Sequence, residues 1–280
     1  ATYFGSNSFS VRLQTEGTGS EESSGAFVRN QNGTGGPYMV LGKSRSTAVN
    51  GVTVVQNADT LGRLSFQGAD GTNLEEAAYI QTAVDGAPGG GDMPGRIIFA
   101  TTADGSASPT ERMRIDRDGN VGLGSIDPRS YYAKELVINA PSEGGMTFVS
   151  GSSNENYIMW ADGTSDLDQY RGYIGYDHAN NWMRFGTNGT EKMVIDTNGR
   201  VGIGLRNQGD YYAKELVVGG GANGGITIAD IVGNSTQYVM FADGTSGSNQ
   251  YRGYIEYAHS NDQMAIASYG VMKFYTWNGS

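Results

Sequence analysis

The clearest pattern along the chain is a short alternation of apolar and polar residues that ends in a Gly-containing pair. Residues 112–116 and 192–196 alternate in this way, and Asp118-Gly119 and Asn198-Gly199 follow them. Such pairs supply the positive φ that a tight hairpin turn requires. Val121 and Val201 then begin the return strands, so the pattern predicts two similar β-hairpins.

Other short runs rich in β-branched and aromatic residues predict further strands. They are residues 97–102, 146–149, 226–228 and 170–176, the last of which contains two glycines that indicate a bulge or a close backbone approach. Residues 74–84 have a helix-like composition, but 79–84 favour a strand. Helix signals are otherwise few, and the sequence predicts an all-β fold of short strands and hairpins.

The hairpin pattern belongs to an internal repeat of about 80 residues. Residues 131–137 return at 211–217 and residues 111–124 return at 191–204, whereas 161–164 and 171–174 return 81 residues later. Residues 271–279 resemble the start of a third copy of the 191–199 hairpin. We therefore divide the chain into a β-rich proximal segment (1–125), repeat one (126–205) and repeat two (206–280), the distal tip.

Composition limits how such repeats are stabilised. The chain has 44 Gly, no Cys and 38% hydrophobic residues, so a single repeat has few large apolar side chains to bury, and disulfides and thiolate metal sites are excluded. The net charge of −10 disfavours a nucleic acid partner, since phosphate contact needs clustered Lys and Arg. No apolar run reaches the length of a membrane span, and no signal peptide begins at Ala1, so we expect no membrane insertion.

Several motifs together resemble a segment of the tail fibres and tailspikes of tailed bacteriophages, which commonly precedes an endosialidase-type intramolecular chaperone. The resemblance is strongest over residues 38–128 and continues more weakly through 131–280. Its motifs are Leu41-Gly42-Lys43-Ser44-Arg45, Asp59-Thr60-Leu61-Gly62, Phe66-Gln67-Gly68-Ala69-Asp70-Gly71, Pro94-Gly95-Arg96-Ile97-Ile98-Phe99, Thr101-Thr102-Ala103-Asp104-Gly105, Pro109-Thr110-Glu111-Arg112-Met113-Arg114-Ile115-Asp116 and Gly119-Asn120-Val121-Gly122-Leu123-Gly124.

This resemblance implies an elongated, intertwined, parallel homotrimer in the virion. It also implies a trimerisation chaperone that cleaves itself off before a Ser, and the chain ends at Ser280, so we expect a mature product or a trimmed fragment. The chain starts within the pattern, and other phage tail proteins are expected to bind through the preceding part. The implied function is attachment to a host surface polysaccharide such as lipopolysaccharide O-antigen.

Aromatic residues are the candidates for carbohydrate binding, because sugars stack their C–H faces on aromatic rings. We select four in the last segment: Tyr257, Tyr269, Tyr275 and Trp277. The alternative is that these rings fill the core, which aromatic side chains do by burying large areas. That alternative is favoured for repeat-matched residues such as Tyr173 and Tyr254.

Motifs for metals and cofactors fail on their spacing. His178 and His259 each lack the further ligands that a metal needs, and we expect both in turns. Asp116-Arg117-Asp118-Gly119 lacks the remaining ligands of a calcium loop, and no helix follows the Gly-rich residues 119–124, as a dinucleotide site requires. The sequence therefore predicts neither a metal nor a cofactor.

Enzyme activity is not expected either. A glycosidase needs two carboxylates on either side of the scissile bond, and candidates such as Asp162 and Asp243 lie in a repeated Ala-Asp-Gly-Thr turn. Three alternatives to glycan attachment stay open: a structural shaft, a polysaccharide depolymerase, and a fibre whose receptor is an outer-membrane protein.

Overall fold

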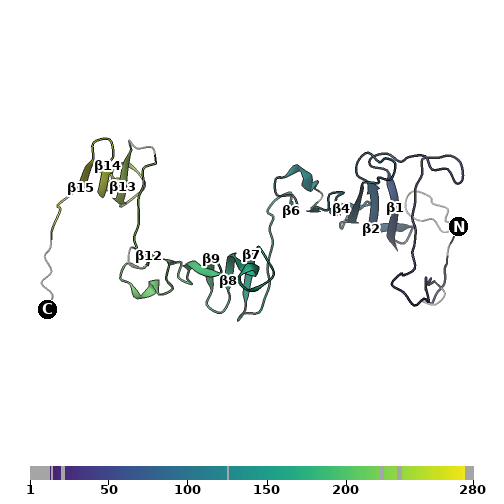
Figure 1. The fold of residues 1–280 in the computed structure, drawn as a ribbon, viewed down its shortest axis with the longest axis horizontal. Helices are drawn as coiled ribbons and strands as arrows, with labels where there is room; N and C mark the ends of the chain where they lie inside the picture. The colour runs from purple at the N-terminus through teal and green to yellow at the C-terminus, as the bar shows by residue number, and fades with distance from the viewer. Residues whose placement is uncertain are drawn as a thin grey trace. The chain divides into compact units, whose positions relative to one another are not determined.

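The computed structural model describes residues 13, 15–19, 23–124, 126–220, 224–231 and 235–274. Over these residues it contains β-strands, short 3₁₀ helices and extended connections, with no α-helix (Figure 1). The predicted all-β fold is confirmed. The chain forms two compact units, residues 1–147 and 148–280.

The first unit contains a six-stranded sheet in which each strand pairs with the next along the chain. Neighbouring strands are antiparallel except β5 and β6, which are parallel and are joined by the 3₁₀ helix η1 (Pro128–Ser130). The strands are β1 (Thr60–Ala69), β2 (Leu74–Val84), β3 (Gly95–Thr101), β4 (Thr110–Ile115), β5 (Val121–Leu123) and β6 (Leu136–Ile138).

The second unit contains a six-stranded sheet of the same topology and then a three-stranded antiparallel sheet. The six-stranded sheet consists of β7 (Glu155–Trp160), β8 (Gly172–Asp177), β9 (Trp182–Thr187), β10 (Thr190–Ile195), β11 (Val201–Ile203) and β12 (Leu216–Val218), with η2 (Asp166–Tyr170) and η3 (Gln208–Asp210) between strands. The last sheet consists of β13 (Thr236–Phe241), β14 (Gly253–Ala258) and β15 (Gln263–Ser268), with η4 (Gly247–Tyr251) after β13.

The three sheets share one register. A tyrosine in the second strand of each sheet pairs with a small residue in the third strand: Tyr79 with Ala100, Tyr173 with Gly186, and Tyr254 with Ala267. Both six-stranded sheets also shift register at the corresponding place between their third and fourth strands. The proximal segment therefore carries a sheet like those of the repeats, although in sequence only residues 111–124 of that segment matched a repeat.

The sheets cross the boundaries that we drew from the sequence repeats. The first sheet passes residue 125 and continues to Ile138, and the second sheet passes residue 205 and continues to Val218. The three-part division stays a prediction about sequence repeats.

The predicted hairpins are confirmed, and their two turns are stabilised by the same pattern of hydrogen bonds. Asp116 Oδ1 accepts hydrogen bonds from the backbone N–H groups of Asp118 and Asn120, both at 2.9 Å. Asp196 Oδ1 accepts the corresponding bonds from Asn198 at 2.8 Å and Arg200 at 3.0 Å. The glycine of each turn has a positive φ, as the Asp-Gly and Asn-Gly pairs predict.

Two strand predictions are wrong. Residues 146–149 and 226–228 form no strand within the described part of the chain. The strand predicted at 170–176 is confirmed as β8, although it starts at Gly172 because Tyr170 ends η2. In the expected third hairpin copy, residues 271–274 form no strand and 275–279 lie outside the described residues.

The core of each six-stranded sheet lies on one face, along a line of cross-strand neighbours that we call the mixed row. Its buried apolar members are Ile98 and Val137 in the first sheet and Val194 and Val217 in the second. The connections around η1 and η3 cover this face, since a Cβ on Gly122 or Gly202 would meet a backbone oxygen of the covering segment at 2.5 or 2.6 Å. The full rows are Arg63, Gln81, Ile98, Arg114, Gly122 and Val137, and Tyr157, Gly175, Arg184, Val194, Gly202 and Val217.

Candidate functional site

The mixed face of the second sheet carries a polar pocket of about 410 Å³. Tyr173 on β8 and Glu191 on β10 both pair with Gly186 on β9, so their side chains project from the same face of the sheet. Gly186 provides the space for the tyrosine ring, because a Cβ there would meet the Tyr173 ring at 2.1 Å. Gly186 on β9 therefore allows Tyr173 and Glu191 to line the same pocket.

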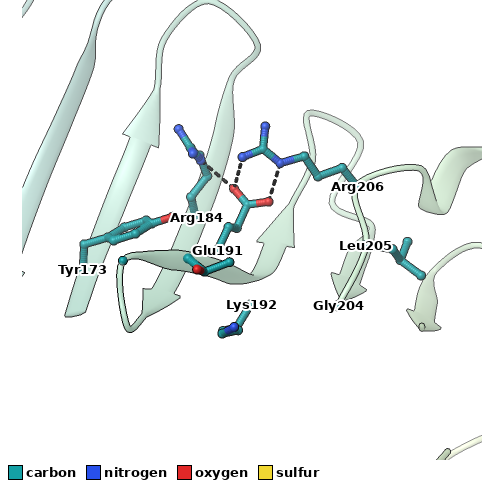
Figure 2. A pocket seen from close by; sticks show the side chains of 9 residues that line it. Tyr173, Arg184, Glu191, Lys192, Gly204, Leu205 and Arg206 are labelled. Atoms are coloured by element: carbon teal, nitrogen blue, oxygen red, sulfur yellow. Dashed lines mark hydrogen bonds and ion pairs between the residues drawn. The ribbon is translucent and has the colours of Figure 1, made fainter. Parts of the chain in front are cut away.

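Two arginines hold Glu191 from opposite sides (Figure 2). Arg184 Nε donates to Oε2 at 2.6 Å, and Arg206 donates through Nε to Oε1 at 2.6 Å and through Nη2 to Oε2 at 2.9 Å. Arg184 also donates to Glu155 on β7 at 2.6 Å. Lys192 extends away from this cluster in Figure 2.

Electrostatics keeps this network charged. Burial by itself would lower the pKa of Arg184, but its hydrogen bond to Glu191 and the charges of Glu155 and Glu191 outweigh burial and raise that pKa above its ordinary value. Arg206 is more exposed, with 53% of its side chain accessible. The pocket therefore presents guanidinium N–H donors and a tyrosine ring to a polar ligand.

The first sheet shows which part of this pocket is scaffold. There Glu111 occupies the position of Glu191 and accepts hydrogen bonds from Arg114 at 2.6 and 2.9 Å. Arg114 pairs with Ile98, whereas Arg184 pairs with Val194, so the arginine has changed strands within one cross-strand pair. A Glu–Arg pair on this face is thus common to both sheets.

Arg206 is the group that the first sheet lacks, because Ile126 stands 80 residues earlier. The sequence did not predict this pocket, since Arg184, Glu191 and Arg206 come from three separate strands or connections. A signal was present: a charged residue replaces an apolar one at a position where the repeats otherwise agree.

The first unit has a second charged cluster, built around the buried carboxylate of Asp85. Arg96 donates to Asp85 Oδ1 at 3.0 Å and Arg129 at 3.3 Å, and the backbone N–H of Arg117 donates to Oδ2 at 3.1 Å. Arg129 also binds Asp127, and this hydrogen bond lowers the pKa of Asp127 to about 2. These guanidinium groups are balanced by neighbouring carboxylates, so the cluster ties β2, β3 and η1 together.

Tyr257, a predicted sugar-binding residue, lies on β14 and is part of a repeated structural motif. Its hydroxyl donates to Asp262 at 3.1 Å, which raises the pKa of Tyr257, and its ring meets His259 edge-on at 4.8 Å. Tyr176 and His178 form the same edge-on contact at 4.9 Å in the preceding sheet. Tyr257 thus stabilises the β14–β15 turn through this hydrogen bond, while its ring stays partly exposed to solvent.

Tyr269 follows β15 and is largely exposed. The guanidinium of Arg252 lies 5.0 Å from its ring centroid, and Arg252 Nε donates to Asp243 at 3.0 Å. The ring is therefore held from one side by a cation and open on the surface. The other two predicted residues, Tyr275 and Trp277, lie outside the described residues.

The described residues include no group of three or more His, Cys, Asp or Glu side chains arranged to hold a metal ion. None of the helices in that part of the chain has the length and apolar character that a membrane crossing requires. His178 and His259 each lie in a turn after a strand, as expected.

No family model and no curated protein sequence matches the chain. Among solved structures, it is similar to the carboxy-terminal domain of the bacteriophage T5 L-shaped tail fibre, with 13% identity and a TM-score of 0.38, over 66% of this chain and 92% of that chain. It is also similar to that domain with its intra-molecular chaperone domain, with 14% identity and a TM-score of 0.39, over 74% of this chain and 69% of that chain. At these values the matches assign neither a family nor a function.

Proposed function

We propose that this chain is the distal, receptor-binding part of a bacteriophage tail fibre, which assembles as a homotrimer and attaches the virion to a polysaccharide of the host surface. Lipopolysaccharide O-antigen is the ligand proposed first. The sequence motifs that resemble tail fibres and tailspikes support the proposal, together with the serial arrangement of the sheets.

The serial arrangement is the observation that carries the fibre part of the proposal. Each sheet is built from one continuous stretch of chain, and every strand pairs only with strands adjacent to it in sequence. The same register then recurs in the next sheet. Repeats that pair with themselves and their neighbours suit a long, modular protein better than a globular enzyme.

The aromatic surface of the last sheet supports the glycan part. Tyr269 offers an exposed ring beside Arg252, and the Tyr257 ring lies beside His259. Rings with adjacent donors and acceptors suit a sugar, which needs an apolar surface for its C–H face and polar partners for its hydroxyls. Several copies of a weak site in one fibre would raise the apparent affinity.

A binding role without catalysis fits the chemistry of the polar pocket around Glu191. Hydrolysis of a glycosidic bond needs one carboxyl group that donates a proton and a second that acts as base or nucleophile. Both oxygens of Glu191 already accept hydrogen bonds from Arg184 and Arg206. This carboxylate therefore serves the scaffold, and we propose no enzymatic activity.

A structural shaft is the second candidate, and one observation favours it. The Tyr257–His259 contact has a counterpart in Tyr176–His178, so it is explained by the fold without any ligand. A shaft would bind no glycan and would only set the length of the fibre.

Binding to cells separates these candidates. The purified protein is incubated with a panel of bacterial strains and with derivatives of each that lack O-antigen, and bound protein is measured after sedimentation of the cells. Binding to a parent strain and not to its derivative is the expected result. Equal binding to both would indicate a protein or core-lipid receptor, release of reducing ends would indicate a depolymerase, and absence of binding across the panel would favour the shaft.

A further inference from the structure

The face of each sheet opposite the mixed row carries a line of apolar cross-strand neighbours, which we call the apolar row. It contains no charged or polar side chain, and it occupies the same register in all three sheets. The rows are Leu64, Ile80, Phe99, Met113, Leu123 and Ile138; Ile158, Ile174, Phe185, Met193, Ile203 and Val218; and Val239, Ile255 and Ile266.

None of these row residues is buried in the single chain. The first residue of each row, on the edge strand of its sheet, is exposed to almost the same degree: Leu64 by 44%, Ile158 by 43% and Val239 by 43%. Two residues further along each edge strand, on the same face, stands an exposed aromatic ring: Phe66, Trp160 and Phe241. The same apolar pair is thus left in solvent three times.

The chain covers its other face instead. In the two six-stranded sheets the mixed row contains buried apolar residues, including Ile98 and Val194, and the η1 and η3 connections pack over it. The ion pairs of Arg114 and Arg184 lie on that face as well. A sheet that covers its charged face and exposes its apolar face is completed by something outside the chain.

We infer that the apolar rows are the contact surface between copies of this chain, with each row packing against the corresponding row of its neighbours. The occupant is a second copy because a partner must match the same apolar register three times along its length, and another copy has that repeat. The chain carries a net charge of −10, so copies repel except where a surface is uncharged, as the rows are. This inference rests on the homotrimer proposed above and assigns the surface that holds it together.

Neighbouring residues of one strand provide a matched test, since they point to opposite faces. Ile158 and Val239 lie in the apolar rows, and Met159 and Met240 follow them on the other face with exposures of 47% and 46%. The double variant Ile158→Lys, Val239→Lys is compared with Met159→Lys, Met240→Lys in the full chain. Mass and dissociation constant are measured by analytical ultracentrifugation, and folding is checked by far-UV circular dichroism.

The row variant is expected to dissociate, with an increase in the dissociation constant of about tenfold or more for each substituted site, because a lysine would be buried without a partner. The control variant is expected to remain within about threefold of the parent protein. An equal effect of both variants, or a larger effect of the control, would overturn the assignment of this face.

Cysteine substitution keeps the inference testable if the lysine variant fails to fold. The chain has no Cys, so Ile158→Cys and Met159→Cys each introduce one thiol. Under mild oxidation Ile158→Cys is expected to form a covalent dimer between chains, and Met159→Cys is expected to stay monomeric on a non-reducing gel. A parent protein that is itself a monomer would overturn the proposed homotrimer too, whereas an oligomer insensitive to both tests at Ile158 would overturn only the assigned surface.

Discussion

Replacing Gln208 should stabilise the second sheet. This side chain is 1% exposed, and neither its Oε1 nor its Nε2 has a hydrogen-bond partner. At the equivalent place in the first sheet stands Pro128, which is also buried and carries no polar side-chain atom. Gln208→Met removes both unsatisfied atoms while keeping a similar length and volume.

The size of the gain follows from two opposing contributions. Each buried polar atom without a partner costs about 1–3 kcal/mol, and a volume-conserving replacement costs up to about 1.5 kcal/mol. Gln208→Met should therefore raise the free energy of unfolding by at least about 0.5 kcal/mol. Gln56→Met changes an exposed glutamine and serves as the control, with an expected effect within about 0.5 kcal/mol.

Urea unfolding followed by tryptophan fluorescence measures this change, because Trp160 and Trp182 lie on β7 and β9 of the same sheet as Gln208. Protein concentration is kept constant, since assembly contributes to stability. A lower midpoint for Gln208→Met, or the same increase for Gln56→Met, would refute the reasoning.

Three further predictions concern charge and binding. The hydrogen bond from Arg129 lowers the pKa of Asp127 to about 2, so the stabilisation from this pair is complete above about pH 4 and is lost as the pH falls to about 2. Asp127→Asn should therefore make the free energy of unfolding less dependent on pH in that range, as measured by circular dichroism. Arg184→Met should lower the free energy of unfolding by about 1–3 kcal/mol, since it leaves two partly buried carboxylates with fewer partners, whereas Arg206→Met should cost no more than about 1 kcal/mol in the same urea experiment. Tyr269→Ala should reduce binding to cells by about fivefold or more without changing the circular dichroism spectrum, and unchanged binding would exclude this ring from the site.

The local pattern of the chain predicted much of the fold because hairpins are local structures. Asp118-Gly119 and Asn198-Gly199 located two turns, since positive φ is nearly confined to a few residue types. The strand predicted at 97–102 corresponds to β3 (Gly95–Thr101), because a run of β-branched and aromatic residues is also a local signal. By contrast, Met146-Thr147-Phe148-Val149 alternates like a strand but pairs with no strand among the described residues, and a ladder needs two partners.

The pocket was not predictable in this way, because its residues meet only through the register of three strands. Arg184 and Glu191 are joined across β9 and β10, and Arg206 arrives from the connection after β11. The similarity of the first sheet to the others was not predictable for the same reason, because it lies more in the strand register than in the residues. Register is conserved there while the residues differ, as Ile98–Arg114 becomes Arg184–Val194.

The most direct test of the central claim, that one chain is an incomplete unit of a fibre, is the mass of the native protein by sedimentation equilibrium at micromolar concentration. The account predicts about 89 kDa, three times the 29.7 kDa of the chain. A single species of 29.7 kDa that retains its circular dichroism spectrum would contradict it, because the apolar rows would then be stable in water without a partner.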